Sequence, residues 1–503
     1  MAPVAVGSCG VLDRRRFVEM AGLAAFGAAL GGAGRASAAA AAFDPATADA
    51  SAMALAMKQG RVTSAALVET ALTRLEKVNG TLNACRFLYA DEARAAASQK
   101  RAGAVAGIPT FTKDLSEEKG RAFTKGCRAY ADRVGGADGG TTAAMRAAGL
   151  ISLGRSTTPE FGLLPTTEPL LGGPTRNPWN PAHSCGGSSG GAGALVAAGV
   201  VPFAHASDGG GSIRIPASAN GLVGLKPSRA RMAGEEGRKE LTAVAVNGCL
   251  SRSVRDTAAW LAALEAKAGS LKPVGLVTGA SRRPLRIGLR AALPGVAVHA
   301  DVLTVFDSAT ALLKRLGHRP VEAPPPYDTP RVSEAFLALW SMGAAEDVRG
   351  VATYLGRAPG SDDVEPATLA FAARAAALTP EQRDAALVVL KTAVAAYLEQ
   401  FDSFDVLMTP VLTAPPPEVG WMGPGVPFDT LLERVVALVA YTPMENVAGA
   451  PAISLPLGMS ATGLPIGLQF SAPPGEERRL LELAYAIERA RPWARLKPAV
   501  WAA

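Results

Sequence analysis

Apolar residues recur at helical spacing along much of the chain, and this pattern predicts the helices. In residues 63–79, Val68, Leu72 and Leu75 fall on one face, and Thr63 stands where an N-cap is expected. Further helices are expected over residues 49–59, 141–148, 300–316 and 476–489, and over most of residues 330–400.

Short apolar runs bounded by glycine, proline or polar residues predict the strands. Residues 285–289, the helix over 300–316 and a segment near Val321 follow a β-α-β pattern, which implies parallel neighbouring strands. The other runs lie at residues 108–112, 151–154, 406–408, 453–457 and 466–470. We therefore expect an α/β fold, in which a mixed β-sheet core is covered by helices on both faces.

A long irregular segment separates these elements. Residues 155–190 are rich in proline, glycine, threonine and asparagine and show no helical or strand period. Ordered loops of this length usually build a functional site. The segment is therefore the first place to look for chemistry.

The N-terminus has the three parts of an export signal. Arginines 14–16 precede an Ala/Gly-rich apolar stretch at residues 20–34, and Ala36-Ser37-Ala38 follows as a small-residue cleavage site. The order resembles a twin-arginine signal, and the alternative is an exposed basic run before a core helix. The apolar stretch is shorter than the roughly 20 residues that span a bilayer, so no stable membrane anchor is expected. We predict a signal peptide at 1–42 that engages the twin-arginine export machinery, a single domain at 43–503, and a periplasmic or secreted location.

Composition narrows the possible partners. The chain has 503 residues, 49% of them hydrophobic, which is enough for a large core. The formal net charge of +7 falls to +5 without the first 42 residues, and basic residues alternate with acids. No basic stripe is present, so a nucleic-acid partner is not expected. Beyond Cys9 in the signal, the cysteines are Cys85, Cys127, Cys185 and Cys249. They have no metal-ligand spacing, and we expect them to be core residues, with a disulfide after export as the alternative. We expect no metal or cofactor site.

Three motifs carry the candidate chemistry. Lys113 ends the apolar run at 108–112, Ser188 lies in Gly-Gly-Ser-Ser-Gly-Gly, and Ser212 lies in Asp-Gly-Gly-Gly-Ser-Ile-Arg-Ile-Pro-Ala. A serine hydroxyl is a poor nucleophile unless a base and oxyanion donors accompany it. A lysine can be that base if burial keeps it neutral. These residues can supply a nucleophile, a proton relay and a base without histidine.

The glycines before Ser212 suit an oxyanion hole. Gly209, Gly210 and Gly211 have no Cβ, so this backbone can turn sharply and present consecutive N–H groups. Such donors stabilise the tetrahedral intermediate of acyl transfer. We predict that the amides of these three glycines form the oxyanion hole.

Residues 107–255 closely resemble the amidase signature family, serine hydrolases that cleave carboxamides, and a weaker match extends over about 50–493. The resemblance implies an amidase that hydrolyses the C–N bond of a small linear or cyclic amide through an acyl-enzyme on Ser212. It assigns the proton relay to Ser188, preceded by a cis peptide bond, and the general base to Lys113.

The same resemblance implies supporting roles. Ser189 would orient the site by hydrogen bonds. Asp208 and Arg214 would anchor the segment between them, which carries Ser212 and is called the nucleophile loop below, through buried polar contacts. Gly209 stands where many family members have a side chain, which predicts a wider pocket.

The resemblance also bears on the substrate. Residues 155–179 are most similar to the branch that contains 6-aminohexanoate cyclic-dimer hydrolases and exported amidases. Apolar side chains in the expected pocket segments favour an uncharged or apolar acyl group; they are Phe161, Leu163, Leu164, Trp421 and Met422.

Two other functions compete with this one. Residues 186–190 satisfy G-x-S-x-G, which would make the chain an α/β-hydrolase-type esterase with Ser188 as nucleophile and a later histidine as base. The histidines are expected to be ordinary surface or loop residues; they are His183, His205, His299 and His318. A non-catalytic exported binding protein of the same fold would not need the lysine and both serines.

Overall fold

The computed structural model describes residues 43–45 and 47–502. The predicted signal peptide at 1–42, with Cys9, lies outside the described residues. The residues from Pro45 onward form one structural unit. Within the described part, no helix combines the length and the apolarity that crossing a membrane requires.

Capping side chains mark the starts of several helices, and the predicted N-cap at Thr63 is one of them. Helix α3 (Ser64–Leu82) begins after Thr63, whose side chain accepts a hydrogen bond from the amide of Ala66. Helix α2 (Ala50–Lys58) begins after Asp49 in the same way. The other α-helices are α4 (Ala90–Ala97), α5 (Gly140–Ala147), α6 (Gly190–Ala197), α7 (Arg214–Asn220), α8 (Val254–Leu264), α9 (Ala300–Arg315), α10 (Thr329–Leu355), α11 (Pro366–Ala376), α12 (Pro380–Glu399), α13 (Phe428–Leu438), α14 (Pro443–Val447) and α15 (Glu477–Ala490).

The strands form two sheets. Their bounds are β1 (Cys85–Leu88), β2 (Pro109–Lys113), β3 (Ile151–Ser156), β4 (Phe203–Asp208), β5 (Val223–Lys226), β6 (Val246–Ser251), β7 (Arg286–Leu289), β8 (Arg319–Glu322), β9 (Val406–Pro410), β10 (Ala452–Met459) and β11 (Pro465–Ser471). The smaller sheet has the order β1-β3-β2, and the larger has the order β4-β6-β5-β10-β11-β9-β7-β8. Strand β7 pairs in parallel with β8 and β9, whereas β10 and β11 are antiparallel. The mixed sheet and its β7-α9-β8 unit agree with the sequence prediction.

Helices cover both faces of the larger sheet. A Cβ added to Gly467 on β11 would collide with Ser218 of α7, and one added to Gly458 on β10 would collide with Val305 of α9. Gly458 lies opposite Ile466, the chain neighbour of Gly467, so the two glycines point to opposite faces. Helices α7 and α9 therefore pack on different faces of the sheet. Each lies so close to the strand beneath it that only glycine fits at the contact point.

Strand β2 of the smaller sheet lies beside β4, the edge strand of the larger one. The hydroxyl of Thr110 donates to the carbonyl oxygen of Phe203 at 3.1 Å, and the amide of Lys113 donates to Nδ1 of His205 at 3.2 Å. Because β4 runs on into the nucleophile loop, this contact brings Lys113 to that loop.

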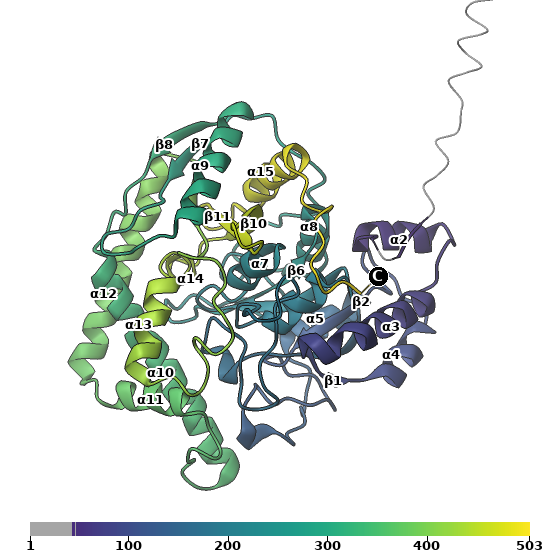
Figure 1. The fold of residues 1–503 in the computed structure, drawn as a ribbon, viewed down its shortest axis with the longest axis horizontal. Coiled ribbons are helices and arrows are strands. Elements are labelled where there is room, and N and C mark those ends of the chain that lie inside the picture. Colours follow the sequence, from purple (N-terminus) through teal and green to yellow (C-terminus); the bar gives the residue numbers. More distant parts are fainter. Residues whose placement is uncertain (1–42, 46, 503) are drawn as a thin grey trace, which may run out of the picture. The chain divides into compact units, whose positions relative to one another are not determined.

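Two short helices at the centre have no exposed face. Every residue of α6 and of α7 is buried, so neither shows the amphipathic pattern that marks the outer helices. Figure 1 shows α10, α11, α12 and α13 on the opposite side of this unit from α3 and α4. The four cysteines that the structure describes are free, and they are buried, as the prediction of core residues requires.

Candidate active site

Lys113 ends β2 with its side chain fully buried. Its Nζ lies 2.8 Å from Oγ of Ser188, 3.1 Å from Oγ of Ser207 and 3.3 Å from the Ser207 carbonyl oxygen. Burial lowers the pKa of Lys113 to about 7, although the charge of Asp208 acts in the opposite direction. A large share of this lysine is therefore neutral near pH 7 and able to accept a proton.

Ser188 and Ser189 lie where the long loop enters α6. The Gly187–Ser188 peptide bond is cis, the arrangement that the family resemblance implies. Ser188 provides the oxygen nearest to Nζ of Lys113. The Ser189 hydroxyl donates to the Ser207 carbonyl at 3.2 Å and accepts from the Ser207 amide at 3.3 Å, so it holds the end of β4 in place.

Ser207 is a site residue that the sequence analysis missed. On β4, Phe203, His205 and Ser207 alternate along the strand, and all three contact residues of β2. Strand β4 is buried almost throughout, so no alternation of polar and apolar positions marks Ser207 in the sequence.

The prediction that every histidine is a surface or loop residue is wrong for His205, which lies on β4. It is fully buried, and burial lowers its pKa to about 3, so the ring is neutral. Its Nδ1 accepts from the Lys113 amide, so Nε2 carries the proton and donates to Oδ1 of Asn247 at 3.0 Å. With both nitrogens engaged, His205 does not serve Ser188 as a base, which removes support from the esterase alternative.

The nucleophile loop is wound around one carboxylate. Asp208 accepts hydrogen bonds from the amides of Gly211 at 2.7 Å and Ile213 at 3.1 Å. It also forms a buried ion pair with Arg214, with 2.9 Å between Nη2 and Oδ1. Burial alone would raise the pKa of Asp208, but Arg214 holds it below its usual range. Ser212 lies between these anchor points, at the entrance to α7.

One predicted oxyanion donor, the Gly211 amide, has another partner in the structure. The amide of Gly211 points at Asp208 and is not available to a substrate oxygen. The hydrogen bonds of the described residues include no acceptor for the amides of Gly209, Gly210 and Ser212. The amides of Gly209 and Gly210 stay candidate donors, and the Ser212 amide joins them as a candidate that the sequence did not suggest.

Arg214 ties the loop to the C-terminal quarter of the chain. Its guanidinium reaches Glu445 Oε2 at 3.1 Å, Gln469 Oε1 at 2.7 Å and Asn446 Oδ1 at 2.5 Å. The Asn446 amide in turn donates to Asp208. Asp208 and Arg214 occupy the anchoring positions expected of them, but no motif drew attention to their partners more than 200 residues away.

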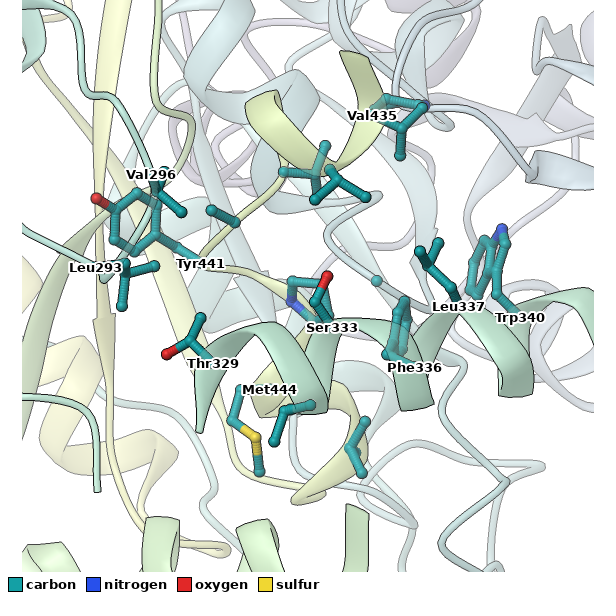
Figure 2. Close-up of a pocket in the computed structure, with 18 of the residues that line it drawn as sticks. Leu293, Val296, Thr329, Ser333, Phe336, Leu337, Trp340, Val435, Tyr441 and Met444 are labelled. Atoms are coloured by element: carbon teal, nitrogen blue, oxygen red, sulfur yellow. The ribbon is translucent and has the colours of Figure 1, made fainter. Parts of the chain in front are cut away.

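A cavity of about 300 Å³ reaches Ser212 and Gly210. Figure 2 shows Phe336 and Trp340 of α10 toward one end and Leu293 toward the other. Most of its wall is apolar, as the sequence predicted for an uncharged acyl group.

The pocket residues were predicted only in part. Leu163 and Leu164 line the cavity, but Phe161, Trp421 and Met422 do not. Met422 is fully buried in the core, and the guanidinium of Arg434 lies over the Trp421 ring. An apolar loop residue can pack into the core as well as line a pocket, and the local sequence does not distinguish the two. Many of the missed wall residues come from α10 and from residues 290–296.

Gly209 does not widen the pocket as expected. A Cβ at this position would lie 3.3 Å from the indole ring of Trp340, and one at Gly210 would lie 3.2 Å from the ring of Phe336. The space that a side chain at 209 would need is therefore occupied by an aromatic ring from α10.

Sequence comparisons with known proteins identify relatives over most of the chain. The Amidase family profile matches residues 66–481. A putative amidase, AmiC, of Mycobacterium tuberculosis (strain H37Rv) is 41% identical over 455 residues, covering 89% of this chain and 95% of that protein. The 6-aminohexanoate-cyclic-dimer hydrolase of Pseudomonas sp. (strain NK87) is 34% identical over 474 residues, covering 90% and 96%.

Solved structures show the same fold. A 6-aminohexanoate cyclic dimer hydrolase complexed with substrate superposes with a TM-score of 0.83 at 31% identity, covering 91% of this chain and 100% of that one. A bacterial aryl acylamidase of the amidase signature family gives a TM-score of 0.79 at 26% identity, covering 90% and 98%. The chain therefore belongs to the amidase signature family and is a hydrolase that acts on amide bonds.

Proposed function

We propose that this amidase works through an acyl-enzyme on Ser212, with Ser188 as proton relay and Lys113 as general base. The observation that carries the proposal is the fully buried Lys113, whose pKa is lowered to about 7 and whose Nζ lies 2.8 Å from the Ser188 hydroxyl. A neutral amine at that distance can accept the serine proton.

In the first half-reaction, Ser212 Oγ attacks the amide carbonyl carbon and gives its proton to Ser188, which passes its own to Lys113. The amides of Gly209, Gly210 and Ser212 stabilise the resulting oxyanion. Lys113 then returns the proton through Ser188 to the substrate nitrogen, the C–N bond breaks, and the amine leaves. The product on the enzyme is an ester of Ser212.

In the second half-reaction, water attacks the Ser212 ester and loses a proton to the same relay. The ester bond breaks, Ser212 recovers its proton, and the carboxylic acid is released. Each half-reaction thus uses Lys113 first as a base and then as an acid, which its lowered pKa permits near neutral pH.

The proposal predicts where a serine-directed reagent reacts. Wild-type protein treated with a fluorophosphonate should carry one adduct on Ser212, found by peptide mass spectrometry, because only this serine is the nucleophile. Ser212→Ala should abolish the label in folded protein. An adduct on Ser188, or none on folded wild type, would contradict the proposal and favour the esterase or the binding-protein alternative.

We further propose that the enzyme is exported by the twin-arginine machinery and acts in the periplasm or outside the cell. Support comes from the order of arginines 14–16, the apolar stretch and the cleavage site. Replacing arginines 14–16 with lysines keeps the charge and should leave the precursor in the cytoplasm of a bacterial host. Arg35→Lys, beyond the apolar stretch, should still be exported. Cell fractionation and the N-terminal mass provide the measurement, and export of the triple variant would exclude this route.

A further inference from the structure

The wall of the cavity beside Ser212 is mostly apolar, and its two charged side chains bind other protein groups. Among the described residues that line the cavity, only Arg290 and Glu445 carry a charged side chain. Arg290 is 4% exposed and donates to the carbonyls of Ala323 at 2.7 Å and Pro324 at 3.0 Å. Glu445 is paired with Arg214. A charged substrate group would lose much of its water against this mostly apolar wall, which is costly.

The cavity belongs to the acyl side of the substrate. Ser212 lines it, whereas Ser188 does not. In the proposed mechanism Ser188 must reach the departing nitrogen, so the amine lies toward Ser188 and the acyl group enters the cavity. The assignment rests on the proposed function.

Trp340 is fixed against the segment that supplies the proposed oxyanion donors. Its indole N–H donates to the carbonyl of Leu163 at 3.1 Å, and its ring stacks with Phe336, one helical turn away, at 5.6 Å between centroids. Together the two rings cover the open sides of Gly209 and Gly210. A ring held by a hydrogen bond, by stacking and by the backbone has little freedom to move aside.

We propose that Trp340 determines acyl specificity by narrowing the cavity next to Ser212, so that the enzyme accepts slim, uncharged, apolar acyl groups. The indole of Trp340 occupies the space that Gly209 leaves. The size of the Trp340 side chain therefore limits the width of the cavity beside the reacting carbon of the substrate. Removing the ring should therefore admit branched or aryl acyl groups.

The test uses fluorophosphonates as acyl mimics and compares rates of Ser212 labelling. The probes carry n-butyl, a branched alkyl of equal carbon number, phenyl, or n-butyl ending in a carboxylate. Wild type should favour n-butyl over the branched, phenyl and carboxylate probes. Trp340→Leu should shift the branched-to-n-butyl rate ratio by about 10-fold or more, the scale of pocket discrimination for small apolar groups. Trp340→Phe serves as a second variant if the leucine protein fails to fold.

Trp421→Leu is the matched control. Trp421 packs against the same core cluster as Trp340 but does not line the cavity, so its loss should leave the rate ratio unchanged.

A second prediction couples positions 209 and 340. Gly209→Ala adds a methyl group 3.3 Å from the indole and should slow labelling, and Trp340→Leu in the same chain should restore part of the rate.

The outcomes separate the two proposals. If no probe labels Ser212 of folded wild type, the proposed mechanism fails. If Ser212 is labelled but Trp340→Leu keeps the wild-type ratio, or Trp421→Leu changes it equally, the role of Trp340 is wrong while the mechanism stands. Equal labelling by the carboxylate and n-butyl probes would overturn the restriction to uncharged groups.

Discussion

Replacing Lys113 with methionine is expected to lower kcat by about 10²–10⁴-fold, the usual contribution of a positioned general base. Methionine matches the length of the buried chain but cannot accept the proton from Ser188, 2.8 Å away in the wild type. The wild-type rate should rise with pH through about 7, because Lys113 is active only when deprotonated and burial lowers its pKa to that value. The rising limb should be absent in Lys113→Met, measured as kcat/KM between pH 5 and 9.

The chain offers a matched control at Lys226. This lysine is also fully buried, and burial lowers its pKa to about 7, but its Nζ donates to the carbonyl of Pro227 and not to Ser188. Lys226→Met should therefore keep the rising limb. If Lys226→Met loses it, or Lys113→Met retains it, Lys113 is not the base.

The second large effect is expected from Gly211→Ala. Gly211 has φ +132°, and an added Cβ would lie 2.7 Å from Cδ1 of Ile215 and also collide with Oγ1 of Thr442. Thr442 donates to the carbonyl of Gly210 at 2.6 Å, so moving it misaligns the proposed oxyanion donors. We expect kcat to fall by about 10²–10³-fold. The free energy of unfolding should fall by about 1–3 kcal/mol.

Gly343→Ala makes the same substitution in open space. Gly343 lies in α10 with no atom within 4 Å of the added Cβ, and its φ is not positive. Its activity should be retained, and its stability should stay the same or rise by up to about 1 kcal/mol. Chemical denaturation and steady-state kinetics check both variants. Wild-type activity in Gly211→Ala would show that the loop tolerates a side chain.

Several outer helices could be predicted because each has one solvent-exposed face and one buried face. Helices α3, α9 and α15 carry their apolar residues at helical spacing, and the predicted bounds differ from the observed ones by only a few residues. The same reasoning failed for β4, β5, β6, α6 and α7. These elements are buried almost throughout, so they show no alternation between polar and apolar positions, and glycine and alanine dominate α6.

Some features of the site could also be predicted from the sequence, and others could not. The sequence by itself determined which residues we propose for the chemistry, because Lys113, Ser188 and Ser212 each lie in a short motif whose glycines and apolar neighbours are local. Only the tertiary structure decided that Gly211 binds Asp208, that His205 and Ser207 meet β2, and that Trp340 fills the space beside Gly209. The physical reason is that backbone preferences and motifs act between near neighbours. Contacts between distant segments depend on how two buried surfaces fit, and neither segment records that fit alone.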